Sequence, residues 1–240
     1  MELLLTDLSI VLPCYNEKDN IVPLVRDLLS QMDFLGGRLE ILVVDDNSPD
    51  GTAQTVRHSF ADEGRVKTIV RTANRGLAFS IREGLERACG RILLVMDTDF
   101  NHPPSTVPVL FHVAEYADLV VGSRFIFGGG MPDRTRYYLS YLYNIFMRLA
   151  LGTRIDDNLS GLFAIRREAL QRLPFEQIFW GYGDYFFRLL LLAQRMSMRV
   201  IQIPVMYGLR PAGEAKTRFL SIFSGYTREV LRLVWRRLQE

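Results

Sequence analysis

The stretch that decides the fold is LLVMDTDFNHPP, residues 93–104. An apolar, partly β-branched run, typical of a buried strand, ends there in two carboxylates, Asp97 and Asp99. Because side chains alternate along an extended chain, both carboxylates point the same way if the extension persists. Two like charges on one side repel unless a cation lies between them, and their oxygens suit Mg²⁺ or Mn²⁺. The pattern indicates a metal site at the end of a strand, with a solvated turn as the alternative.

Polar clusters follow two other predicted strands in the same way. The strand at 8–13 leads into the cluster at 15–17, and the strand at 39–44 leads into Asp45 and Asp46. Helical spacing follows each of these strands, and for the first helix Asp19 or Asn20 is the expected N-cap. Strands that alternate with helices predict an α/β fold with a doubly wound, mainly parallel sheet. In such sheets ligands bind beyond the carboxyl ends of the strands, where the three clusters should meet.

Composition is that of one globular domain. The chain has 240 residues, of which 48% are hydrophobic, and no linker, repeat or low-complexity tract divides it. A net charge of +2 gives no overall basic character, so nucleic acid is not an expected partner. Cys14 and Cys89 are too few for a disulfide framework, and their spacing from the three histidines matches no zinc pattern.

No apolar run reaches the roughly 20 residues that a membrane-spanning helix needs. Glu2 and Asp7 interrupt the apolar start of the chain, which is therefore not typical of a signal peptide. We expect a cytoplasmic protein, attached at most peripherally to the cytoplasmic face of a membrane. The tail at 217–238 alternates apolar and basic residues at helical spacing, so it predicts either a helix on an anionic membrane surface or one packed on the sheet.

Three motifs together resemble family 2 glycosyltransferases of the GT-A fold. They are LPCYNE at 12–17, VVDDNSPDGT at 43–52 and DTDFNHPP at 97–104. The most similar branch is that of the dolichyl-phosphate (polyprenyl-phosphate) mannosyltransferases, and the likeness covers nearly the whole chain. Residues 1–213 would form the glycosyltransferase domain, with a nucleotide-sugar and metal half at 1–122 and an acceptor half at 123–213. Residues 214–240 would then form a helical tail.

The resemblance implies a Mg²⁺- or Mn²⁺-dependent, inverting transfer of a hexose from a nucleotide diphosphate sugar. Mannose is the first expectation and glucose the next, from a donor of the GDP-mannose or UDP-glucose type. The metal ligands implied by matching position are Asp97, Asp99 and Asn101. The residues implied around the nucleotide are Pro13, Tyr15, Asn16, Glu17, Asp45, Asp46, Arg75 and Asp97.

The acceptor implied by the resemblance is the phosphate of a polyprenol. A membrane surface or a membrane-anchored partner would then lie nearby, and the sequence leaves the oligomeric state open. The residues implied to bind phosphates are Arg124, Arg136, Ser140, Arg210 and Lys216. Those expected to carry the chemistry are Asp99, Arg124 and Asp184.

Departures from the family pattern keep alternatives open. Asn101 stands where the branch has glutamine, and Ala215 where it has serine. Asp184 lies near the position where relatives that glycosylate hydroxyl groups have a general base, so a hydroxyl acceptor is the first alternative, although an acidic residue also suits a helix start. A dinucleotide-dependent oxidoreductase is disfavoured because no G-x-G-x-x-G follows the first strand. A non-catalytic sugar-nucleotide-binding subunit is the last alternative.

Overall fold

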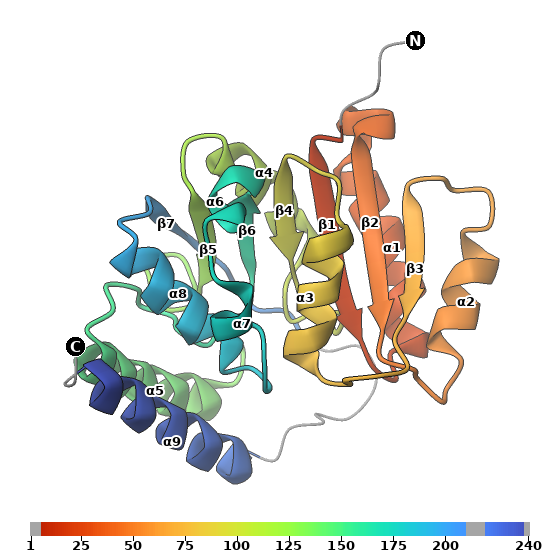
Figure 1. Ribbon diagram of the computed structural model, residues 1–240. Helices are drawn as coiled ribbons and strands as arrows, with labels where there is room; N and C mark the ends of the chain where they lie inside the picture. The colour runs from red at the N-terminus through yellow and green to blue at the C-terminus, as the bar shows by residue number, and fades with distance from the viewer. Residues whose placement is uncertain (1–5, 210–218, 238–240) are drawn as a thin grey trace.

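The computed structural model describes residues 6–209 and 219–237. Within them, strands form one seven-stranded sheet in the order β3-β2-β1-β4-β6-β5-β7 (Figure 1). The strands are β1 Leu8–Cys14, β2 Leu39–Asp45, β3 Val66–Val70, β4 Ile92–Val95, β5 Leu119–Ser123, β6 Phe163–Arg166 and β7 Val200–Pro204. The helices are α1 Lys18–Gln31, α2 Thr52–Ser59, α3 Leu77–Arg87, α4 Val107–Ala114, α5 Arg134–Leu151, α6 Arg167–Gln171, α7 Phe175–Ile178, α8 Tyr185–Arg195 and α9 Phe219–Arg237.

The predicted doubly wound, mainly parallel sheet is confirmed. β1 runs parallel to both β2 and β4, β2 runs parallel to β3, and β5 runs parallel to β7. The strand β6 is antiparallel to β4 and β5, which the sequence did not anticipate. A short apolar run predicts extended structure but carries no information about its direction.

Helices cover both faces of the sheet, which explains why every residue of β1 and β2 is buried. On one face, Ile10 and Leu12, which lie two positions apart in β1, belong to the cluster that packs against α1 and α4. On the other face, Val11 and Val44 pack against α3. A third cluster joins α5, α8 and α9, which lie along one end of the molecule (Figure 1).

The predicted N-cap of α1 is wrong. The helix begins at Lys18, with Glu17 in the capping position, so Asp19 and Asn20 lie inside its first turn. The Asn20 side chain instead donates a hydrogen bond to Glu17 Oε2 at 2.8 Å. By contrast, α5 has a side-chain cap, since Asp133 accepts a hydrogen bond from the Arg136 amide at 2.9 Å.

No helix among residues 6–209 and 219–237 is long and apolar enough to cross a membrane.

Candidate active site

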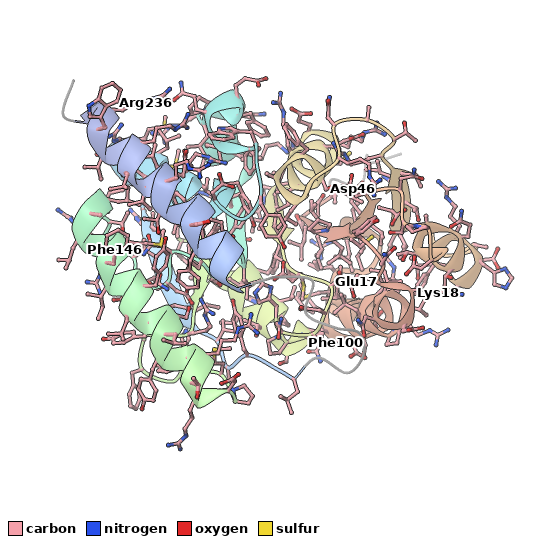
Figure 2. All side chains as sticks on the ribbon, turned by 90° about the horizontal axis from the view of Figure 1, so that it is seen from below. Glu17, Lys18, Asp46, Phe100, Phe146 and Arg236 are labelled. Atoms are coloured by element: carbon pink, nitrogen blue, oxygen red, sulfur yellow. The ribbon has the colours of Figure 1, made fainter. Side chains whose placement is uncertain are left out.

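Parallel pairing places the carboxyl ends of β1, β2 and β4 at one edge of the sheet. Figure 2 views the molecule from this side, and Glu17, Asp46 and Phe100 are labelled on the loops that follow the three strands. The three polar clusters of the sequence therefore meet at one edge, as predicted.

The loop after β2 is fastened to the loop after β1 through Ser48. Asp45 is 1% exposed, and its carboxylate accepts hydrogen bonds from the Ser48 hydroxyl and from the Ser48 amide at 3.0 Å. The Ser48 hydroxyl oxygen in turn accepts from the Asn16 amide at 2.9 Å. Asn16 has a φ of 54°, a left-handed conformation that asparagine tolerates better than most residues. Burial, followed by the charge of Asp45, raises the pKa of the Cys14 thiol, which therefore stays protonated beside that carboxylate.

Tyr15 and Arg75 provide the open surface of this edge. The Arg75 guanidinium lies 5.0 Å from the centre of the Tyr15 ring, and Tyr15 is 40% exposed. Beside them, the Glu17 amide donates to the Thr52 hydroxyl at 3.1 Å, which binds the start of α2 to the start of α1. Of the predicted nucleotide residues, Pro13 lies within β1, one residue from its end.

Asp46 supports the loop that carries Arg75. One of its oxygens lies 2.7 Å from Arg71 Nη1, and the other accepts from the Gly76 amide at 2.7 Å. Arg71 is buried and also donates to the carbonyl of Asn74 at 2.8 Å. Arg71 was not among the predicted site residues, although it follows β3 directly, just as the aspartates follow their strands.

Asp97 and Asp99 occupy the loop after β4. The Asp97 side chain is 44% exposed, while Asp99 accepts hydrogen bonds from the Asn101 amide at 3.1 Å and from the Asn101 side chain at 2.7 Å. Among the described residues no group of three or more His, Cys, Asp or Glu side chains is arranged to hold a metal ion. A hard cation bound by this loop would need further oxygen ligands, which a bound diphosphate provides.

A buried histidine that the sequence reasoning missed holds this loop. His102 Nδ1 accepts a hydrogen bond from the Asp97 amide at 3.0 Å, so the ring hydrogen is on Nε2. His102 Nε2 lies 3.1 Å from the Ser160 carbonyl oxygen and 3.0 Å from the Tyr207 hydroxyl. The aspartate loop is therefore joined directly to the segments that precede β6 and follow β7.

A close backbone approach completes this junction. The Gly208 amide donates to the Asn101 carbonyl at 3.0 Å. A Cβ atom on residue 208 would come within 2.4 Å of the Phe100 carbonyl oxygen, so only glycine fits there. The segment after β7, which leads to the predicted Arg210 and Lys216, therefore contacts the loop at 96–103 that carries Asp97 and Asp99 (the aspartate loop). Both of these residues lie outside the described part of the chain.

Arg124 is buried and forms an ion pair with Asp157, which the sequence did not predict. Its Nε and Nη2 donate to the two oxygens of Asp157, each at 2.7 Å, and its amide donates to Asp157 Oδ2 at 3.0 Å. Its guanidinium also packs on the rings of Phe125 and Tyr207. Burial alone would lower the pKa of Arg124, but the charge of Asp157 outweighs it and raises that pKa, so the arginine stays charged. Nη1 is the end of the guanidinium that Asp157 does not engage.

The remaining predicted residues divide between two helices. Arg136 and Ser140 lie one turn apart on α5, the first exposed and the second buried. Asp184 lies in the capping position of α8, with Oδ2 2.5 Å from Arg188 Nη1 and Oδ1 accepting from the Tyr182 amide at 2.7 Å. Both oxygens of this carboxylate are thus engaged by the protein.

Comparison with known proteins gives consistent results. Residues 9–173 match the family model Glycosyl transferase family 2. The chain is 32% identical over 233 residues to a dolichol-phosphate mannosyltransferase of Pyrococcus furiosus, with 94% of this chain and 63% of that one covered. It is 33% identical over 220 residues to an undecaprenyl-phosphate mannosyltransferase of Micrococcus luteus, with 86% of this chain and 85% of the relative covered. The chain thus spans less than two thirds of the Pyrococcus furiosus relative.

The structure resembles that of glucosyl-3-phosphoglycerate synthase from Mycobacterium tuberculosis, solved in complex with Mn²⁺, uridine diphosphate and phosphoglyceric acid. The TM-score is 0.69 at 20% identity, with 97% of this chain and 78% of that one covered. At this identity the likeness concerns the fold, and it confirms the predicted GT-A architecture.

The pairing of Arg124 gives a test of what holds the site together. Asp157→Asn should lower the free energy of unfolding by roughly 3 kcal/mol, because removing one partner of a buried ion pair leaves an uncompensated charge. The neighbouring Asp156→Asn is the matched control, since Asp156 pairs with Arg148, which is 42% exposed. That variant should lose about 1 kcal/mol or less. Urea denaturation of both variants measures the difference, and equal losses would contradict a supporting role for Asp157.

Proposed function

The chain belongs to glycosyl transferase family 2, and from this premise we propose that it transfers a hexose from a nucleotide diphosphate sugar to a polyprenyl phosphate. Mannose is the proposed sugar and glucose the next candidate, from a donor of the GDP-mannose or UDP-glucose type. The observation that carries the proposal is the convergence of the aspartate loop, the Tyr15–Arg75 surface and Arg124 around one edge of the sheet. We propose residues 1–122 as the donor half, 123–213 as the acceptor half and 214–240 as the tail.

For the donor, we propose that Asp97 and Asp99, with Asn101, hold Mg²⁺ or Mn²⁺ together with the diphosphate. Carboxylate and amide oxygens are the donor set that these hard cations take, and two carboxylates leave positions for phosphate oxygens. Such an ion, when bound, neutralises the charge that develops on the leaving diphosphate. The nucleotide would lie over Tyr15, Asn16 and Glu17, with Pro13 and Asp45 beneath it and Arg75 at its side.

The roles of Asp45 and Asp46 differ in this proposal. A carboxylate can accept the imino N–H of a uracil or guanine base, and we propose Asp45, at the end of β2, for this role. Its carboxylate is buried and already accepts from Ser48, so a base would have to share or displace that contact. Asp46 is fully occupied with Arg71 and the Gly76 amide, so it serves by holding the Arg75 loop.

For the acceptor, a phosphate oxygen would attack the anomeric carbon as the bond to the diphosphate breaks, which inverts that carbon. No general base is required, because the second pKa of a phosphate monoester is about 6 and the oxygen is already anionic at neutral pH. We assign the binding of this phosphate to Arg136, Ser140, Arg210 and Lys216. Arg124, oriented by Asp157, is the charge that faces the transferred group.

A second candidate is transfer to a hydroxyl group with Asp184 as the general base. The location of Asp184 at the start of α8 keeps this candidate open. Against it, the Arg188 guanidinium and the Tyr182 amide occupy both carboxylate oxygens. A non-catalytic binding subunit is the third candidate, and it would lack turnover altogether.

A lipid acceptor requires contact with a membrane surface, and we propose that α5 provides it as a peripheral attachment on the cytoplasmic side. Exposed apolar side chains line this helix, with Leu142 62% and Leu149 81% exposed. On the adjacent α9, Leu231 and Trp235 are also exposed. Aromatic and aliphatic side chains among arginines suit an anionic interface. A membrane-anchored partner protein is the other occupant that would cover this face.

The metal assignment can be tested with Asp99→Ala. Turnover should fall by roughly a hundredfold or more, because several kcal/mol of charge stabilisation in the transition state are lost. The thermal stabilisation of the protein by a nucleoside diphosphate with Mn²⁺, measured over GDP, UDP, dTDP and CDP, should also disappear. The control is Asp62→Ala, an exposed carboxylate on a turn before β3. Full activity of the Asp99 variant would refute the metal role.

The acceptor assignment can be tested by comparing Arg136→Ala with Asp184→Asn. The arginine variant should lose roughly tenfold to a hundredfold in transfer to polyprenyl phosphate, the cost of one charge-assisted contact, with nucleotide affinity unchanged. Arg134→Ala removes an equal charge from the same helix turn and should have little effect. Asp184→Asn should be mild, because Arg188 keeps Glu229 and two carbonyl groups as partners.

The opposite pattern would favour the second candidate. An inactive Asp184→Asn that still unfolds cooperatively, together with an active Arg136→Ala, would show that the acceptor is a hydroxyl group. Inactivity of the unaltered protein toward every donor, with nucleotide binding intact, would favour the non-catalytic subunit.

The membrane assignment can be tested by liposome flotation. A variant with Leu142→Glu and Leu149→Glu should lose binding to vesicles that contain anionic lipid, since two charges then replace apolar contacts. The control places the same charges at Phe34 and Tyr116, which are 54% and 73% exposed on another part of the surface. Equal flotation of the two variants would show that α5 does not face the lipid.

A further inference from the structure

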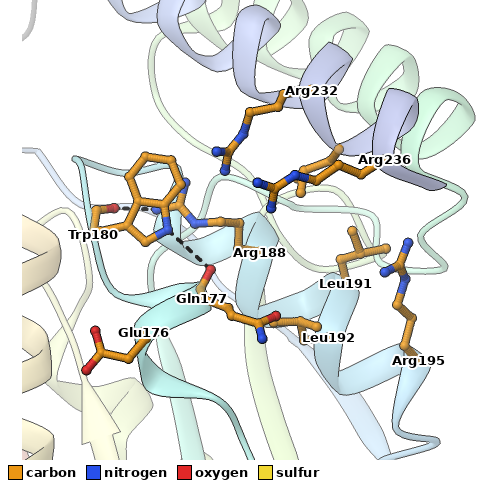
Figure 3. Close-up of a pocket in the computed structure, with 10 residues that line it drawn as sticks. Glu176, Gln177, Trp180, Arg188, Leu191, Leu192, Arg195, Arg232 and Arg236 are labelled. Carbon is orange, nitrogen blue, oxygen red and sulfur yellow. Dashed lines mark hydrogen bonds between the residues drawn. The ribbon is translucent and has the colours of Figure 1, made fainter. Parts of the chain in front are cut away.

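A cationic pocket lies between α7, α8 and α9. Its lining residues do not include Asp97, Asp99 or Arg124, although Arg188 in its wall contacts Asp184. Its volume is about 300 Å³. Figure 3 shows Arg232 and Arg236 reaching from α9 toward the side where Trp180 and Arg188 lie, with Arg195 at the end of α8 nearby. None of these residues was singled out by the family motifs. We propose that this pocket binds the phosphate group of an organic phosphate.

The charge around the pocket is predominantly positive. Arg188, Arg195, Arg232 and Arg236 line it, and Glu176 is the only carboxylate among the described lining residues. Glu176 is itself engaged, because both of its oxygens accept hydrogen bonds from Arg82 at 2.8 and 2.6 Å. Asp184 and Glu229 pair with Arg188 and Arg232, but arginines still outnumber carboxylates around the pocket, so it attracts an anion.

Two arginines of the pocket wall, Arg188 and Arg232, are held in place by contacts within the protein. Arg188 is 2% exposed, and it contacts Asp184, Glu229 and the Trp180 carbonyl while it packs 3.8 Å from the centre of the Trp180 ring. Arg232 donates to the same Glu229 oxygen at 2.7 Å and packs 4.7 Å from the same ring. A site whose cations are fixed in advance loses little conformational entropy when it binds a ligand.

Two arginines of this pocket, Arg232 with a buried N–H and the exposed Arg236, are incompletely partnered within the part of the chain that the structure describes. Arg232 Nε is buried and forms no hydrogen bond with any described residue. No described residue forms an ion pair with Arg236, although its neighbours Arg188 and Arg232 on the pocket wall are paired. A buried N–H without an acceptor costs free energy, which a ligand oxygen would recover.

Phosphate fits this arrangement better than a carboxylate. Guanidinium groups bind phosphate through paired hydrogen bonds, and its several oxygens can serve more than one arginine at once. The leucines Leu191, Leu192 and Leu233 supply an apolar side to the pocket, which suits an organic substituent on the phosphate. The phosphate can come from a free phosphate ester or from an anionic lipid headgroup, since α9 lies beside the exposed α5.

Trp180 provides a reporter within the pocket. The chain has two tryptophans, so Trp235→Phe leaves Trp180 as the single indole. In this background, inorganic phosphate should change the fluorescence of Trp180 in a saturable manner, while sodium acetate at the same ionic strength should not. Vesicles of phosphatidylcholine, with and without phosphatidic acid, form the second arm and test the lipid source.

Arg236→Gln should weaken phosphate binding by roughly tenfold or more, the effect expected for losing a charge-assisted hydrogen bond. Arg228→Gln is the matched control, because Arg228 is also exposed on α9 but does not line the pocket. A response to phosphate that depends on Arg236 supports a free phosphate ester. The same dependence seen only with phosphatidic acid vesicles supports a lipid headgroup. No saturable response in either arm, an equal response to acetate, or equal effects of the two substitutions would overturn the proposal.

Discussion

Parallel pairing of β1 with β2 and β4 is the constraint on which the site depends. Parallel strands must all end at the same edge, so their following loops are forced together regardless of what those loops contain. In this chain the loops contain carboxylates, and crowded carboxylates repel unless each has a partner. The structure supplies these partners from within the loops, with Ser48 on Asp45, Arg71 on Asp46 and Asn101 on Asp99. The Asp97 side chain is 44% exposed, so a ligand can reach this carboxylate.

Three buried polar residues extend this cross-linking beyond the edge of the sheet. Arg71 joins the loop after β2 to the loop before α3, and His102 joins the aspartate loop to Ser160 and Tyr207. Asp157 fixes Arg124 at the end of β5. Hydrogen bonds of this kind are costly to leave incomplete in a buried setting, so each connection favours a single geometry of the site. His102 thus adds a side-chain connection between parts of the chain that the pairing of β4 with β6 already joins in one continuous sheet.

The sequence predicted that the polar clusters meet at one edge of the sheet, but it did not predict the contacts that support them. Asp97 and Asp99 could be found because two charges interrupt an apolar run, which is a local signal. His102 and Asp157 could not, because their partners Ser160 and Arg124 lie 58 and 33 positions away in the sequence. The same limit applies to β6, whose apolar run predicted a strand but not its antiparallel direction. The prediction of the α1 N-cap was wrong for a different reason. Asp19 and Asn20 have side chains that can cap a helix, but both lie just inside it.

Arg124 and Arg188 are both buried, but they use their hydrogen-bond donors differently. Arg124 binds a single carboxylate through two parallel hydrogen bonds, which fixes the plane of the guanidinium and leaves Nη1 directed away from Asp157. Arg188 is surrounded instead, because Asp184, Glu229 and two backbone carbonyls take up its donors. An arginine whose donors are saturated by the protein can hold elements together but has little left for a ligand. This difference supports the proposed role of Arg124 at the substrate, while Arg188 connects α8 to α9 through Asp184 and Glu229. Asp184 is ion-paired with Arg188. Its carboxylate is therefore better suited to stabilise this connection between the helices than to remove a proton from a sugar-accepting hydroxyl group.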